Sequence, residues 1–94
     1  MRILGRIPHP VLQISVFAND GRFPVQFEAG GVAQIYRFRQ SESVKTFADV
    51  EALLDEEFLA GVLTQFREMK RLRDELLTRR QPTPDELSDL PDII

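Results

Sequence analysis

The chain has 94 residues, of which 43% are hydrophobic and 29% are charged, so it can form one domain with a thin core. It contains no cysteine, which excludes disulfides, thiolate metal sites and cysteine nucleophiles within this sequence. No stretch approaches the roughly 20 apolar residues that cross a bilayer, so we predict no membrane segment. The absence of cysteine fits the reducing cytoplasm, which is the location that we expect.

The net charge of −3 conceals blocks of opposite sign. Residues 1–47 carry six basic and three acidic groups, and residues 48–57 carry five acidic groups and no basic one. Residues 58–80 again carry six basic and three acidic groups, whereas residues 81–94 carry four acidic groups only. Blocks of this kind constrain the choice of partner more than the total charge does.

The first half of the sequence alternates with the two-residue period of half-buried strands. We predict strands at 11–18, 22–29 and 32–39, preceded by a short edge strand at 3–7. Asn19-Asp20-Gly21 and Gly30-Gly31 supply residues that tolerate positive φ, so they are predicted to form the turns between these strands.

Two features of these strands are irregular. Pro24 cannot donate a ladder hydrogen bond, so its strand is expected to begin late or to be irregular there. If Ile35 faces the core, Tyr36 and Phe38 join Phe17 on the second face of the sheet, which should be polar. Either something covers that face, which we favour, or the assumed register is wrong by one residue.

Two helices are predicted after a connector at residues 41–45. Thr46 and Asp49 have the spacing of a capping box, which opens a short helix at 47–54. Asp55 can cap a long helix that continues to Arg80, and the two glutamates that follow it complement the positive end of the helix dipole. The pattern leaves open whether these are two helices or one bent helix.

The long helix changes character along its length. Its first half has a wide apolar face, suited to covering a sheet, whereas its second half keeps a narrow apolar stripe beside Lys70 and Arg73. A helix of 26 residues is about 39 Å long, whereas a strand of eight residues spans about 26 Å. We therefore expect the helix to extend beyond the sheet. The stripe is too short for a long coiled coil, but it suits a short helix pair at a dimer interface.

Residues 81–94 combine acidic residues with apolar ones, and Thr83-Pro84 could start a helix of one or two turns. Such a composition predicts an acidic, flexible tail that becomes ordered when it docks. The predicted organisation is a single α+β domain at 1–80 followed by this tail at 81–94.

The sequence contains no recognisable catalytic or metal-binding pattern. His9 lies between two prolines and has no histidine or cysteine companion, so we predict a loop residue. Gly30-Gly31 lacks the spacing of a phosphate-binding glycine motif, and Asp55 with its two neighbouring glutamates is explained by helix capping. We predict no enzymatic activity, no cofactor, no metal site and no small-molecule substrate.

Six basic residues lie in the second half of the long helix, and they leave three interpretations open. Glu75 is spaced to pair with both Arg71 and Arg79, which indicates a solvated, salt-bridged helix surface. The same basic residues could dock on an acidic segment, including the tail of this chain or of another copy. They could also contact the phosphates of a nucleic acid.

We predict an α+β fold in which an antiparallel β-meander of three or four strands is followed by a short helix and one long C-terminal helix. This order occurs in many unrelated small domains, including some antitoxins, so it does not assign a function by itself. We expect a non-enzymatic protein-interaction or assembly subunit, homodimeric, that acts through the long amphipathic helix and the acidic tail. The expected partner-binding residues are Phe66, Met69, Lys70, Arg73, Leu76, Leu77, Leu87 and Leu90.

The alternative is a regulatory, antitoxin-like protein that associates with nucleic acid through the basic second half of the helix. Phosphate contacts of this kind weaken steeply with salt, which distinguishes them from apolar contacts. The residues expected to make them are Arg67, Lys70, Arg71, Arg79 and Arg80.

Overall fold

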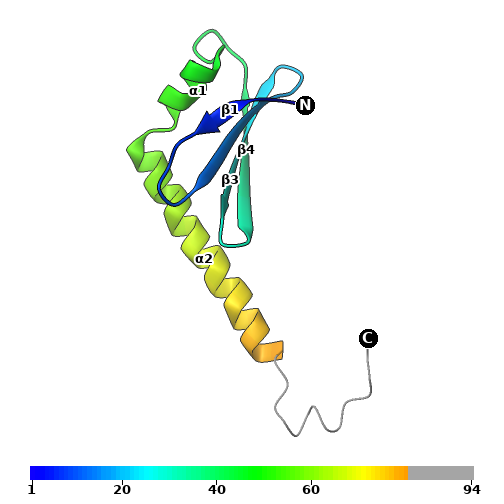
Figure 1. Cartoon of the computed structure of the whole chain (residues 1–94), viewed down its shortest axis with the longest axis vertical. Coiled ribbons are helices and arrows are strands. Elements are labelled where there is room, and N and C mark those ends of the chain that lie inside the picture. The colour runs from blue at the N-terminus through cyan, green and yellow to red at the C-terminus, as the bar shows by residue number, and fades with distance from the viewer. Residues whose placement is uncertain (81–94) are drawn as a thin grey trace, which may run out of the picture.

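A computed structural model describes residues 1–80 of the chain, and within this range it forms one four-stranded antiparallel sheet followed by two helices (Figure 1). The predicted α+β meander with a short helix and a long helix is thereby confirmed. The predictions for residues 81–94, including Leu87 and Leu90, lie outside the described residues. The elements are β1 (Arg2–Ile7), β2 (Gln13–Ala18), β3 (Arg22–Ala29), β4 (Val32–Arg39), α1 (Phe47–Leu53) and α2 (Glu56–Arg80).

The strands follow one another across the sheet in the order β1-β2-β3-β4. The turn between β2 and β3 uses Asp20 and Gly21 with φ of 52° and 79°, and the turn between β3 and β4 uses Gly30 and Gly31 with φ of 57° and 84°. Positive φ at both central residues matches the right-handed twist of the flanking strands. Both predicted turns therefore join strands as hairpins.

Pro24 does not delay the start of β3, which begins at Arg22, so the prediction of a late start was wrong. The residue pairs with Arg37 of β4, and the whole of β3 stays in register with that strand. The continuous ladder between β3 and β2, however, ends at Val25. The ladder therefore stops beside the one residue of β3 that has no backbone N–H to donate.

The pairing of β3 with β4 corrects the predicted faces of β4. Residues directly opposite one another in an antiparallel pair point to the same side of the sheet. Tyr36 and Phe38 therefore face the core, Ile35 is 48% exposed on the other side, and the assumed register was the error. No second cover is needed for these two rings. The decisive pairs are Phe23 with Phe38, Val25 with Tyr36, and Phe27 with Gln34.

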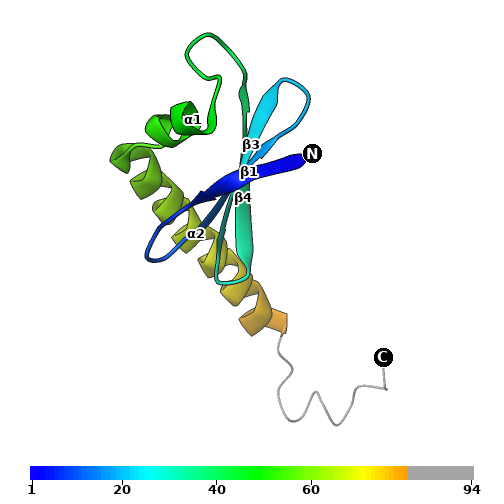
Figure 2. The ribbon, with the colours of Figure 1, turned by 45° about the horizontal axis from the view of Figure 1, so that its top comes forward.

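Both helices pack on one face of the sheet, as the separate views in Figures 1 and 2 show. The ring of Phe58 on α2 lies 5.2 Å from that of Tyr36 and 6.0 Å from that of Phe27, measured between centroids. Gln34 adds a polar tie, because its Nε2 donates to the carbonyl of Val62 over 3.0 Å. The buried core consists of Leu12, Ile14, Val16, Phe23, Val25, Phe27, Val50, Leu54, Val62 and Phe66.

The start of α1 carries the predicted capping box. The hydroxyl of Thr46 accepts from the backbone N–H of Asp49, and the carboxylate of Asp49 accepts from the backbone N–H groups of Thr46 and Lys45. α1 ends at Leu53, with Leu54 as its C-cap. Asp55 then caps α2, because its carboxylate accepts a 2.8 Å hydrogen bond from the N–H of Phe58. Two separate helices answer the question that the sequence left open.

The capping box should make stability depend on pH. The hydrogen bond from the backbone of Lys45, more than any other contact, lowers the pKa of Asp49 from its ordinary value of 3.8. A carboxylate with a lowered pKa in the folded state stabilises it above the ordinary value, and this contribution is lost as pH falls through the folded value. We expect urea titrations to show a stability deficit of Asp49→Asn near neutral pH that shrinks below about pH 4. A deficit that is constant with pH would contradict this assignment.

Candidate interaction surfaces

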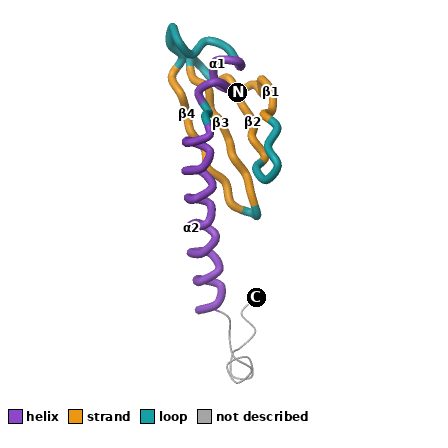
Figure 3. Tube along the Cα trace, turned by 90° about the vertical axis from the view of Figure 1, so that its left-hand side faces the viewer, coloured by secondary structure: helices purple, strands orange, loops and turns teal. Residues whose placement is uncertain are grey.

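α2 runs past the end of the sheet. Its 25 residues make a helix about 37 Å long, which exceeds the length of the eight-residue strands β3 and β4. Figure 3 shows the helix continuing beyond the turn between β3 and β4. We call residues 74–80, which follow the last contact of α2 with that turn, the overhang; it is about 10 Å long.

Two basic residues of α2 hold the turn between β3 and β4. The Nη1 atom of Arg73 donates a hydrogen bond to the carbonyl of Gly30. The side chain of Lys70 lies across the same turn, so closely that a Cβ atom added at Gly30 would be 2.7 Å from Lys70 Cε. Lys70 and Arg73, both predicted to bind a partner, therefore lie against the sheet of their own chain. This contact also fixes where the overhang begins.

Removal of the Arg73 side chain should loosen the hairpin. We expect Arg73→Ala to lower the free energy of unfolding by about 1 kcal/mol, because it loses a charged hydrogen bond that is partly exposed to water. Faster hydrogen exchange of the amides around Gly30 and Gly31 should accompany the loss. Arg67→Ala is the matched control, since among residues 1–80 Arg67 bonds only to Thr64 of its own helix. Equal effects of the two variants would mean that the contact with the turn does not stabilise the fold.

The end of α2 carries exposed leucines, with Leu72 just before the overhang and Leu76 and Leu77 within it. Leu76 follows Met69 by seven residues and Val62 by fourteen, so it lies on nearly the same line of the helix as these core-facing residues. Leu77 follows Phe66 by eleven residues, which again is close to a whole number of turns. The line therefore continues where the sheet has ended. The exposed fractions are 55% for Leu72, 47% for Leu76 and 61% for Leu77.

The remaining predicted partner-binding residues in the described range lie closer to the core. Phe66 is only 2% exposed and belongs to the core, so its side chain is inaccessible to a partner in this fold. Met69 is half-buried and packs against the edge of the core. The apolar surface that stays accessible on α2 therefore starts later than the sequence indicated, at Leu72.

The residues of the alternative nucleic-acid set are spread around α2. Arg71 pairs with Glu68 one turn before it and with Glu75 one turn after it, at 3.1 Å and 2.6 Å. Its hydrogen bond lowers the pKa of Glu68 below the ordinary 4.5, and the same bond raises the pKa of Arg71. Arg79 and Arg80 lie in the last turn, where positive charge complements the helix dipole. Intrahelical pairing, the first of the three interpretations, therefore accounts for Arg71.

A second group of arginines lies on the sheet, where the sequence analysis had not looked for a site. The outer face, opposite the helices, carries Arg6, Arg22, Arg37 and Arg39, all exposed. Within residues 1–80 none of their side chains forms an ion pair or a hydrogen bond with another side chain. Strand pairing is what places them together, because they come from β1, β3 and β4.

Comparison with family models, curated proteins and solved structures finds no match for this chain. The assignment of a function must therefore come from the surfaces themselves. In the described part of the chain, neither helix is long and apolar enough to cross a membrane.

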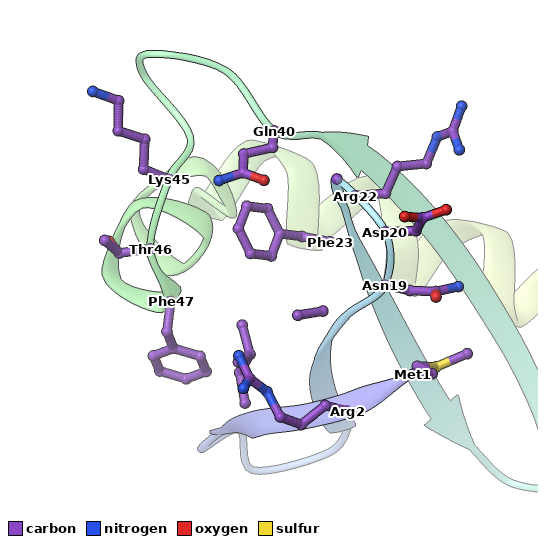
Figure 4. A pocket seen from close by; sticks show the side chains of 13 residues that line it. Met1, Arg2, Asn19, Asp20, Arg22, Phe23, Gln40, Lys45, Thr46 and Phe47 are labelled. Carbon is purple, nitrogen blue, oxygen red and sulfur yellow. The ribbon is translucent and has the colours of Figure 1, made fainter.

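An open depression of about 600 Å³ lies between the start of β1, the turn between β2 and β3, and the start of α1. Figure 4 shows the guanidinium of Arg2 directed into it, whereas the ends of Arg22 and Lys45 point away. The basic groups around this depression therefore do not converge on one point. Among residues 1–80 no cluster of three potential metal-binding side chains occurs.

His9 has a structural position in the loop between β1 and β2. Its Nδ1 accepts hydrogen bonds from the backbone N–H groups of Val11 and Leu12, at 3.1 Å and 3.0 Å. Both donors come before β2, which begins at Gln13, so the bonds lie in the loop itself. The ring therefore orders the loop, in agreement with the prediction of a loop residue.

Proposed function

We propose that this protein is a non-enzymatic assembly subunit that forms a homodimer through the overhang of α2. The observation that carries the proposal is the apolar line of α2, which Arg73 interrupts at the end of the sheet and which resumes beyond it at the exposed Leu76 and Leu77. A helix that served only to cover the sheet could end at Arg73, whose side chain bonds to the turn between β3 and β4. The side-chain contacts of the seven further residues, such as that of Glu75 with Arg71, are made with their own helix.

A second copy fits the overhang in an antiparallel arrangement. An apolar stripe related to itself by a two-fold axis is self-complementary, so each copy supplies the surface that the other lacks. The antiparallel arrangement also carries the basic residues Arg79 and Arg80 of one copy back towards Asp74 and Glu75 of the other. A parallel pair would instead place the two basic ends side by side, where like charges repel.

The end of the sheet limits the length over which two overhangs can pack against each other. A helix is about 10 Å across. A second helix that packs on the exposed leucines therefore lies on the same side of α2 as the sheet, in line with it. The partner overhang would therefore meet the β3–β4 turn end-on, which limits the overlap to about two turns. The lost freedom of two molecules costs several kcal/mol, so three partly exposed leucines per copy support only a weak dimer.

Sedimentation and light scattering of the intact chain from micromolar to millimolar concentration test the proposal. The expected result is an average mass that rises with concentration from that of one chain towards that of two. Methyl resonances of Leu72, Leu76 and Leu77 should shift over the same concentration range, because these side chains enter the interface. A particle that stays monomeric throughout, with no binding of an apolar dye, would overturn the homodimer.

A further inference from the structure

We propose that the outer face of the sheet binds residues 81–94 of the same chain, as an intramolecular site for an acidic, apolar segment. We define the arginine face by its apolar members Ile3, Phe17 and Ile35 and its basic members Arg6, Arg22, Arg37 and Arg39. The inference is independent of the homodimer, because it concerns the side of the sheet opposite α2.

The arginine face joins apolar surface to an unbalanced positive charge. Ile3 is 50% exposed and lies opposite Phe17, while Ile35 on the other edge is 48% exposed. The only carboxylate at an outward-facing position of the described strands is that of Glu28, which already accepts a hydrogen bond from Gln26. The four arginines therefore share this face with exposed apolar side chains and with almost no negative charge.

The pairing of Arg22 with Arg39 is the strongest electrostatic argument that this face favours an acidic ligand. These residues are direct partners across β3 and β4, and like charges directly opposite one another destabilise a sheet. Nothing in the fold of residues 1–80 offsets this repulsion by an ion pair. A carboxylate placed between the two guanidinium groups would convert the repulsion into two attractions.

Residues 81–94 have the complementary composition. They carry four acidic residues and no basic one, against four arginines and one glutamate on the face. They also carry the apolar side chains of Leu87, Leu90, Ile93 and Ile94, of which the last two come late enough in the segment to reach beyond Ile35. Nucleic acid would satisfy the arginines but would have to compete with this tethered acidic segment for them.

The length of the segment allows it to reach the face. From Arg80 back past the β3–β4 turn and along β4 to Ile35, the element lengths give a path of about 35 Å. Fourteen residues span up to about 46–50 Å when extended, and about ten of them cover this path, so about the last four residues of the segment can lie on the face beyond Ile35. A tether this short also keeps the segment at a high effective concentration, so modest contacts suffice for binding.

Paramagnetic labelling of the full chain tests this inference. The chain has no cysteine, so Ser88→Cys gives one site for a spin label. Methyl groups of isoleucine then report both sides of the sheet, because Ile3 and Ile35 lie on the arginine face whereas Ile14 is buried beneath the helices. We expect the label to broaden the methyl signals of Ile3 and Ile35 at least five-fold more than that of Ile14.

Charge variants of the labelled chain separate binding from mere proximity. Arg37→Glu combined with Arg39→Glu, and separately Asp89→Asn combined with Asp92→Asn, should each reduce the broadening of Ile35 several-fold. Arg67→Glu is the matched control, because it reverses the charge of an exposed arginine on α2 and should leave the broadening unchanged. The methyl signal of buried Ile14 shows in every variant that the domain is still folded.

Four results would overturn the inference. The first two are equal broadening of the methyl signals on both sides of the sheet and broadening centred on the leucines of the overhang. The other two are broadening that the arginine variants leave unchanged and broadening that arises only between different chains. The last is measured by mixing spin-labelled chains with methyl-labelled ones. If the methyl signals of Ile3 and Ile35 instead respond to an added single-stranded oligonucleotide and not to the label, the face binds nucleic acid.

Discussion

Phe66→Ala should destabilise the protein by about 3–5 kcal/mol, the largest effect that we expect from a single substitution. The side chain is only 2% exposed and lies in the core between α2 and the sheet. Its removal loses the transfer free energy of the ring and leaves a cavity that the surrounding strands can fill only in part. A domain of this size has a total stability of about 4–12 kcal/mol, so much of the protein would unfold at 37 °C.

Urea unfolding followed by circular dichroism measures this loss. The matched control is Leu72→Ala, which shortens an apolar side chain of the same helix that is 55% exposed. We expect the control to change the free energy of unfolding by less than about 0.5 kcal/mol. The comparison also tests the reassignment of Phe66 from the predicted partner surface to the core. Similar losses in both variants would mean that the helix does not pack on the sheet as described.

The elements themselves could be predicted because their signals are local. The two-residue alternation located β3 and β4 with the bounds that the structure has, and the turn residues between the strands adopt the positive φ for which they were chosen. Thr46 and Asp49 form the expected capping box. Each of these signals involves neighbours within four residues, so no tertiary contact was needed to interpret it.

The buried face of each strand was harder to predict than the strand itself, because alternation defines two faces and does not say which of them is buried. The turn contains the missing information. A two-residue loop at Gly30 and Gly31 makes Ala29 the partner of Val32, so odd residues of β3 share a face with even residues of β4. Counting outwards from the turn would have placed Tyr36 beside Val25. The burial of Tyr36 was therefore derivable from loop length, although not from periodicity.

The contact of Arg73 with the sheet depends on the length of the strands, which can be calculated from the sequence. A strand of eight residues spans about 26 Å, which a helix covers in about 17 residues. Counted from Glu56, that length ends close to Arg73, where the structure has the contact with Gly30. The arginines of the outer face could not be found in this way. They come from β1, β3 and β4, and only the pairing of those strands brings them together.

Leu76→Glu should weaken self-association at least ten-fold, the second-largest effect that we expect, since about 1.4 kcal/mol corresponds to each factor of ten in a dissociation constant. Under the proposed antiparallel pairing, the substitution places a carboxylate in the centre of the interface and, by the two-fold symmetry, a second one nearby. Burying both charges without partners costs far more than the apolar contact that is lost. Sedimentation across the concentration range measures the change.

Thr78→Glu supplies the matched control, because it adds the same charge to the overhang two residues later, on the side away from the apolar stripe. We expect this control to associate like the unmodified chain, and both variants to unfold within about 0.5 kcal/mol of it, since each site is exposed. If both substitutions weakened association equally, net charge rather than the stripe would govern it. If neither did, the contact between copies would have to lie elsewhere, and the overhang would lose its proposed role.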